Sequence, residues 1–83
     1  MSFRNEVIEL LIKTAAELFG VDASILGAET NFVKDLTAKS TDLVKFTVAL
    51  EDEYDVEVPF MAFKRQATFG AAADYIAELT GNE

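Results

Sequence analysis

The fold is decided by the stretch STDLVKFTVALEDEY, residues 40–54. Its core-facing positions recur at helical spacing in a single stripe, which consists of Leu43, Phe46, Thr47, Leu50 and Tyr54. Ser40 stands where a helix N-cap is expected, and Asp42 lies in the first turn, where negative charge suits the helix dipole. The stretch therefore predicts an amphipathic helix that buries one face against the rest of the chain.

Two further long helices are expected around this one. The first covers residues 3–19 and ends before Gly20, and the last covers residues 69–80, with Thr68 as its cap and Gly81 as its stop. The buried face predicted for the last helix consists of Phe69, Ala72, Ala73, Ile76 and Leu79. A short helix at residues 60–66 follows Pro59. The sequence thus predicts an all-α fold, a four-helix antiparallel bundle of three main helices and one short helix.

Residues 21–39 lack sustained periodicity and are rich in turn formers. A loop of this length is uncommon in a compact domain, so we expect it to be ordered by contacts with the core. The apolar residues expected to make these contacts are Val21, Ile25, Leu26, Phe32, Val33 and Leu36. One short helical turn is predicted near residues 23–26.

The composition excludes several functions. The 83 residues suit one domain, residues 1–83, and they contain no Cys and no His, which removes the thiolate nucleophile, the usual general base and the commonest metal ligands. The net charge of −8 opposes binding to nucleic acids and to anionic membranes, and it favours partners with basic patches. No membrane span or secretory signal is visible. We therefore expect a cytoplasmic, monomeric protein without a metal site.

An acidic cluster occupies residues 51–57, where five of seven side chains are acidic. These charges lie at the C-terminal end of the central helix, where the dipole disfavours them. They are interpreted as a solvated face, a recognition surface for a basic partner, or a weak divalent-ion site. The spacing is not that of an EF-hand.

Ser40 has no residue to activate it as a self-sufficient nucleophile, because the chain lacks His and Cys. On its own it is interpreted as a helix cap. A serine at a helix N-terminus can, however, carry a phosphodiester, because free backbone N–H groups and the positive end of the dipole favour phosphate there.

The run FVKDLTAKSTD, residues 32–42, resembles the attachment segment of the acyl carrier protein family. The resemblance continues through ALEDEY at 49–54, EVP at 57–59 and AAADYI at 71–76. It implies a carrier, not an enzyme, whose Ser40 bears a 4′-phosphopantetheine arm that holds acyl groups as thioesters. The implied partners are a phosphopantetheinyl transferase and acyl ligases, synthases or acyltransferases with basic docking patches.

The sequence departs from the family pattern around Ser40. Lys39, Thr41 and Lys45 replace an acid, a leucine and a further acid, so residues 34–45 carry three lysines against two aspartates, a local sum of +1. This departure favours a specialised carrier in fatty acid, lipid or polyketide biosynthesis. A peptidyl or aminoacyl carrier and an unmodified helical interaction module remain the alternatives.

The resemblance also implies two sets of contact residues. The candidate partner contacts are Asp35, Lys39, Thr41, Asp42, Lys45, Val48, Glu51 and Asp52. The candidate walls of an acyl cavity are Leu43, Phe46, Leu50, Phe63 and Ile76. Phe63 stands where a small core residue is common, so its ring either plugs the cavity or swings aside to line it. Phe60 or Met61 is expected to form an exposed contact patch.

Overall fold

The computed structural model describes residues 2–82, and within this range it contains four α-helices and no strand. The helices are α1 (Phe3–Phe19), α2 (Ser40–Tyr54), α3 (Phe60–Lys64) and α4 (Phe69–Thr80), and a 3₁₀ turn, η1 (Ala23–Ile25), lies between α1 and α2. The predicted all-α fold and the bounds of the three long helices are confirmed. The short helix ends at Lys64 rather than at residue 66, because the Arg65 and Gln66 N–H groups already turn back to the carbonyls of Ala62 and Phe63.

The helix ends follow from local backbone chemistry. Gly20 and Gly81 both adopt left-handed conformations, with φ of 65° and 74°, directly after α1 and α4. Glycine takes this conformation without the steric penalty of a side chain. At the start of α4, the Thr68 Oγ1 atom accepts a hydrogen bond from the Ala71 N–H at 3.1 Å. The predicted stops and the predicted Thr68 cap are therefore confirmed.

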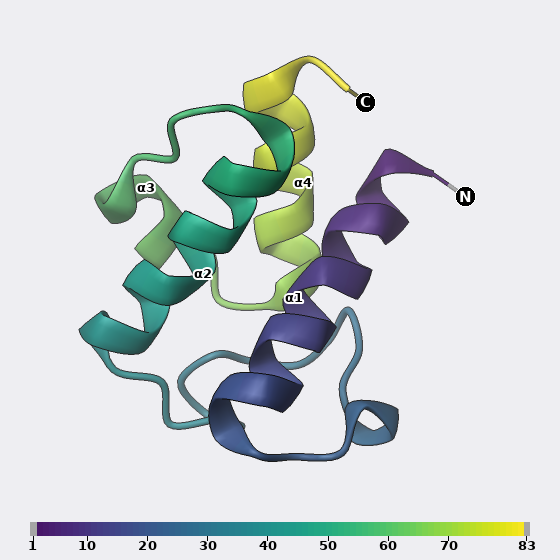
Figure 1. Cartoon of the computed structure of the whole chain (residues 1–83), viewed down its shortest axis with the longest axis vertical. Helices are drawn as coiled ribbons and strands as arrows, with labels where there is room; N and C mark the ends of the chain where they lie inside the picture. Colours follow the sequence, from purple (N-terminus) through teal and green to yellow (C-terminus); the bar gives the residue numbers. More distant parts are fainter. Residues whose placement is uncertain (1, 83) are drawn as a thin grey trace.

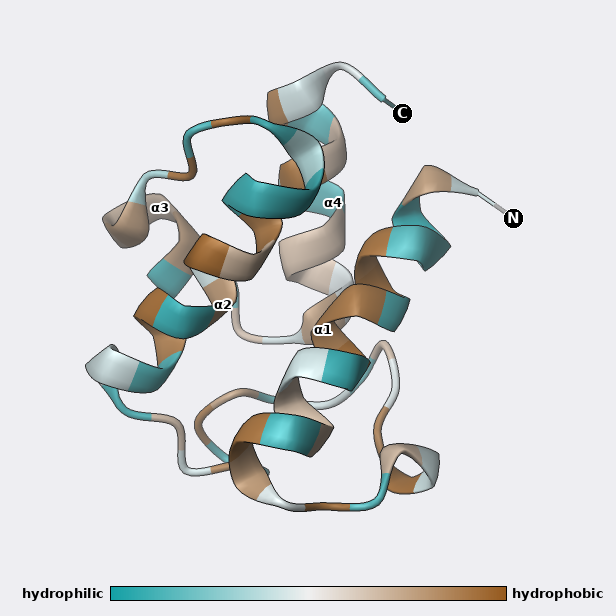
Figure 2. Cartoon of the chain, viewed as in Figure 1, coloured by the Kyte–Doolittle hydropathy of each residue, from teal (hydrophilic) through white to brown (hydrophobic). Residues whose placement is uncertain are grey.

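The long helices form a bundle in which α1 runs opposite to α2 and α4 (Figure 1). α1 packs against both of these helices, and α3 packs against α2. Hydrophobic and hydrophilic bands alternate along α1 and α2, whereas α4 is mostly apolar to neutral (Figure 2). This difference fits the burial of α4, in which Phe69, Ala72, Ala73, Ile76 and Ala77 are all buried.

Phenylalanine rings dominate the core. Phe32, from the loop before α2, has its ring centroid 5.1 Å from that of Phe46, 5.5 Å from Phe63 and 4.9 Å from Phe69. All four of these side chains are buried. Aromatic pairs at such separations contribute about 0.5–1.5 kcal/mol each beyond their burial. Phe32 therefore joins the loop to α2, α3 and α4 at once.

The loop is also joined to the start of α4 through the backbone. The Phe32 N–H donates to the Ala67 carbonyl at 3.1 Å, and the Phe69 N–H donates to the Thr30 carbonyl at 3.0 Å. Order in the loop thus comes from the buried Phe32 ring, from backbone hydrogen bonds, and from the predicted contacts Leu26 and Leu36, which pack half-buried against the core. Fewer of its apolar side chains are needed in the core than the sequence predicted.

Three burial predictions are wrong. Ile25 is 71% exposed and Val33 is 61% exposed, so neither holds the loop to the core. Val33 directly follows Phe32, and its N–H is bonded to the Asn31 side chain in a tight turn that leaves Val33 facing solvent. Leu79 is 39% exposed, because Ala77 takes the buried position in the last turn of α4.

Candidate functional site

Ser40 is the first residue of α2, and its side chain is exposed. The extended residue before it, Lys39, occupies the N-cap position, and the Asp42 Oδ2 atom accepts a hydrogen bond from the Lys39 N–H at 3.0 Å. The prediction that Ser40 caps α2 is therefore wrong, because Asp42 closes this turn instead. Within residues 2–82 the Ser40 hydroxyl has no hydrogen-bond partner, so it is free to react.

The segment that leads to Ser40 is held by side chains rather than by regular secondary structure. The Asn31 Oδ1 atom accepts hydrogen bonds from the N–H groups of Val33 and Lys34, at 3.0 and 2.8 Å. In return, the Asp35 Oδ2 atom accepts from the Asn31 N–H at 2.7 Å. Thr37 then adopts a left-handed conformation with φ of 53°, which is unusual for a β-branched residue. These contacts set the direction in which the chain enters α2.

A pocket of about 450 Å³ lies beside Ser40. Phe32, Ala38 and Leu43 supply apolar walls. Four cationic residues also line it, namely Lys34, Lys39, Lys64 and Arg65, and no acidic residue is found among the described residues of its lining. This is more than half of the seven Lys and Arg of a chain whose net charge is −8. The two cations from α3 and its C-cap are the functional candidates that sequence reasoning missed, because they lie far from Ser40 along the chain.

The candidate partner contacts divide into two groups. Lys39, Thr41, Lys45, Val48 and Asp52 are exposed. The other three carboxylates are bonded to the backbone: Asp35 and Asp42 in the turns described above, and Glu51 through the Val58 N–H at 2.8 Å. These three carboxylates thus hold the backbone in place, in addition to any contact with a partner.

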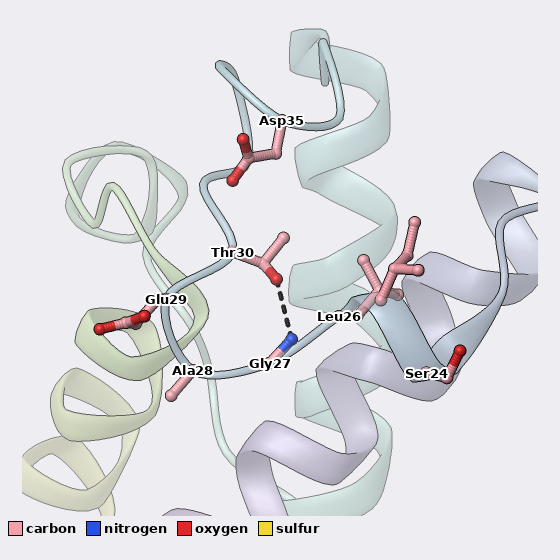
Figure 3. A pocket seen from close by; sticks show the side chains of 8 residues that line it. Ser24, Leu26, Gly27, Ala28, Glu29, Thr30 and Asp35 are labelled. Atoms are coloured by element: carbon pink, nitrogen blue, oxygen red, sulfur yellow. Dashed lines mark hydrogen bonds between the residues drawn. The ribbon is translucent and has the colours of Figure 1, made fainter.

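Asp35 faces a second hollow, of about 380 Å³, formed by η1 and the loop that follows it. Its lining does not include Ser40. Figure 3 shows the Gly27 N–H donating a hydrogen bond to the Thr30 hydroxyl within this loop. Asp35 lies beyond Thr30 in the same view. At the other end of the hollow, the Asp22 carboxylate accepts from the Ser24 N–H at 2.9 Å, and this bond lowers the pKa of Asp22. The hollow is therefore a consequence of how the loop is ordered.

Exposed apolar residues accompany the outer face of α2. Val44 and Val48, four residues apart, are 45% and 46% exposed, and Met61 on α3 is 62% exposed. Val44 was not among the predicted contacts, although its place outside the buried stripe indicated its exposure. Of the two residues expected to form an exposed contact patch, Met61 is exposed, whereas Phe60 is half-buried.

All five candidate walls of the acyl cavity are buried. Only Leu43 among them lines the pocket beside Ser40, and the Phe32 ring separates that pocket from Phe46 and Phe63. In this structure the pocket therefore ends at the phenylalanine cluster. An acyl chain that goes deeper has to displace those rings.

The acidic cluster at the end of α2 shows no ligand arrangement. Within residues 2–82, no three acidic side chains converge as metal ligands would. Tyr54, inside the cluster, packs against Phe3 with ring centroids 5.0 Å apart. Burial, followed by the nearby charges of Glu6 and Glu53, raises the pKa of Tyr54.

The comparisons with known proteins agree with this geometry. The family model described as "Phosphopantetheine attachment site" matches residues 9–76. The chain belongs to this family. An acyl carrier protein from Picosynechococcus sp. is 34% identical over 77 residues, which cover 93% of this chain and 95% of the relative. An acyl carrier protein from Enterococcus faecalis superposes with a TM-score of 0.73 at 31% identity, and all of both chains is covered.

Membership establishes the general role. The chain is an acyl carrier protein, and the family bears a 4′-phosphopantetheine group. Members act as carriers rather than as enzymes, and they work with transferases and synthases. Residues 2–82 contain no helix with the length and hydrophobicity of a transmembrane segment.

Proposed function

We propose that Ser40 is the attachment serine and that the chain is one carrier domain, specialised for a fatty acid, lipid or polyketide pathway. The observation that carries this proposal is the free, exposed hydroxyl of Ser40 at the start of a 15-residue helix, beside a pocket of about 450 Å³. Its neighbour Thr41 is also exposed but does not line that pocket.

The residues around Ser40 fit a phosphate diester. The first-turn N–H groups of α2 have no intrahelical acceptor, and the helix dipole places positive charge at this end. Lys39, in the N-cap position, adds a cation directly before the serine. When attached, the arm supplies the thiol that a chain without Cys lacks.

The exposed face of α2 is the proposed contact surface for enzymes that load and use the carrier. Val44 and Val48 provide apolar contacts along it, and Asp52 begins an exposed acidic end that suits basic docking patches. Lys39 and Lys45 interrupt this acidic character next to Ser40. A dedicated partner with a matching surface there is therefore part of the proposal.

The test is the intact mass after incubation with coenzyme A and a broad-specificity phosphopantetheinyl transferase. The native chain should gain one arm, Thr41→Ala should gain it as well, and Ser40→Ala should not. Because the Ser40 hydroxyl caps nothing, Ser40→Ala should change the free energy of unfolding by less than about 0.5 kcal/mol. Arm attachment to a well-folded Ser40→Ala variant would refute the assignment.

A further inference from the structure

We propose that the pocket beside Ser40 receives the far end of the carried acyl group, and that it selects short acyl groups that end in a carboxylate. This inference rests on the proposed attachment at Ser40. The Ser40 pocket is the hollow of about 450 Å³ lined by residues 31–34, 38–40, 43 and 64–67.

The lining of the Ser40 pocket carries four positive charges. Lys34 and Lys39 come from the loop before α2, and Lys64 and Arg65 come from the end of α3; the folded structure brings all four to one hollow. The only ion pair formed within residues 2–82 joins the Arg4 Nε atom to Asp74, 2.7 Å apart, so these four cations have no carboxylate partner there. One arm phosphate carries about one negative charge, which leaves about three positive charges to be balanced.

Apolar side chains form the back of the same pocket. Phe32 and Leu43 are almost fully buried and form the wall behind the cations, with Ala38 half-buried beside them. An apolar wall behind a charged rim fits a ligand with a few methylene groups and one anionic end. The pocket volume lies within the range of about 300–1,000 Å³ that is usual for small-molecule sites.

The rest of the molecule would repel such a ligand. The chain as a whole has a net charge of −8, so a terminal carboxylate is disfavoured at most of its surface. A purely alkyl chain needs no cations, and it gains only from apolar burial. The concentration of cations at the attachment point therefore favours an anionic cargo over a neutral one of the same length.

The experiment compares two nearly isosteric cargoes on the native carrier. The Ser40 arm is loaded with a glutaryl group, which ends in a carboxylate, or with the corresponding primary amide, which is neutral. Hydroxylamine then cleaves the thioester, and the rate reports how far the pocket shelters it. Amide chemical shifts of Leu43 and residues 64–67 report occupancy of the pocket directly.

The glutaryl thioester should be cleaved about three to ten times more slowly than the amide at low salt, because exposed ion pairs are individually weak and several act together. The difference should shrink in 0.5 M NaCl. It should be lost in Lys64→Gln with Arg65→Gln. It should persist in Arg4→Gln with Lys13→Gln, which removes the same charge from α1, outside the pocket.

Equal cleavage rates for the two cargoes, or a difference that survives Lys64→Gln with Arg65→Gln, would overturn the proposal. The proposal would also be overturned if attachment of the unloaded arm changed the amide chemical shifts of residues 64–67 as much as the glutaryl-loaded arm does. The cations would then bind the arm phosphate alone. Failure of the proposed function is seen separately, as the absence of any mass gain at Ser40. In that case the same cargoes can be tethered chemically to a Ser40→Cys variant, because the native chain contains no other cysteine. The amide chemical shifts of Leu43 and residues 64–67 are then compared between the two cargoes.

Discussion

Replacing Phe63 with leucine tests whether the phenylalanine cluster closes the interior of the carrier. Phe63 is fully buried, and its ring centroid lies 5.5 Å from that of Phe32 in an edge-to-face arrangement. The change removes about three buried carbon atoms at about 0.8 kcal/mol each, and it also removes an aromatic contact worth about 0.5–1.5 kcal/mol. Together these losses should lower the free energy of unfolding by about 3–4 kcal/mol. A domain of this size loses about 4–8 °C of melting temperature for each kcal/mol, which gives a fall of about 12–32 °C.

Thermal melts followed by circular dichroism measure this effect, and Met61→Leu is the matched control. Met61 lies on the same helix but is 62% exposed, so its melting temperature should stay within about 3 °C of the native value. The second readout is acyl penetration: with an octanoyl group on the arm, chemical shifts at Leu50 and Ile76 should change more in Phe63→Leu than in the native carrier. A small stability loss, or no gain in these shifts, would show that Phe63 is not the plug.

Three further changes test other parts of the structure. Thr37→Gly should raise the free energy of unfolding by about 0.5–1 kcal/mol, because glycine relieves the strain of φ at 53° but loses part of that gain to the entropy of the unfolded chain. Urea unfolding measures this free energy, and a loss of stability would show that Thr37 is not strained. The raised pKa of Tyr54 means that the folded protein holds this proton more tightly, so its contribution to stability should be full below about pH 10 and fall as the pH rises further. Tyr54→Phe should reduce this fall in melting temperature. Parallel curves of melting temperature against pH for the two proteins would contradict the raised pKa. The double change Lys39→Asp with Lys45→Glu should speed arm attachment by a transferase with a basic docking surface at low salt; a rate unchanged at every ionic strength would show that these lysines do not control docking.

The helices could be predicted because their signals are local. Gly20, Thr68 and Gly81 each decide a helix end through their own backbone or side chain, and the structure uses them in this way. The stripe on α2 was equally reliable, since four of its five members are buried and Tyr54 is half-buried. Periodicity describes which side chains share a face, and a bundle needs little more than that.

The Ser40 cap and the loop could not be predicted in the same way. Serine is a preferred N-cap, but whether Ser40 or its neighbour takes that position depends on where Asp42 finds a donor, and it finds the Lys39 N–H. Ile25 and Val33 were expected in the core on hydrophobicity alone. Their exposure follows from turns closed by local hydrogen bonds to backbone carbonyls and to Asp and Asn side chains, and periodicity does not describe such turns.

The grouping of charge around Ser40 is likewise a tertiary property. Lys34 and Lys39 are near the serine in sequence, but Lys64 and Arg65 reach the same pocket only because α3 packs against α2. The sequence therefore showed a weakly positive segment, whereas the structure shows four cations around one hollow.

The loop before α2 explains how Ser40, the proposed attachment serine, is held in place in so small a domain. Phe32 fixes one end of the final segment by packing on three helices, and the Ala38 N–H, two residues before Ser40, donates to the Phe32 carbonyl at 3.0 Å. Between them the strained turn at Thr37 reverses the backbone. Ser40 is thus tied to the buried Phe32 ring through one hydrogen bond and a short stretch of chain. Disturbance of the phenylalanine cluster, by mutation or by an entering acyl group, should therefore change the structure first at the start of α2 and at the Ser40 pocket.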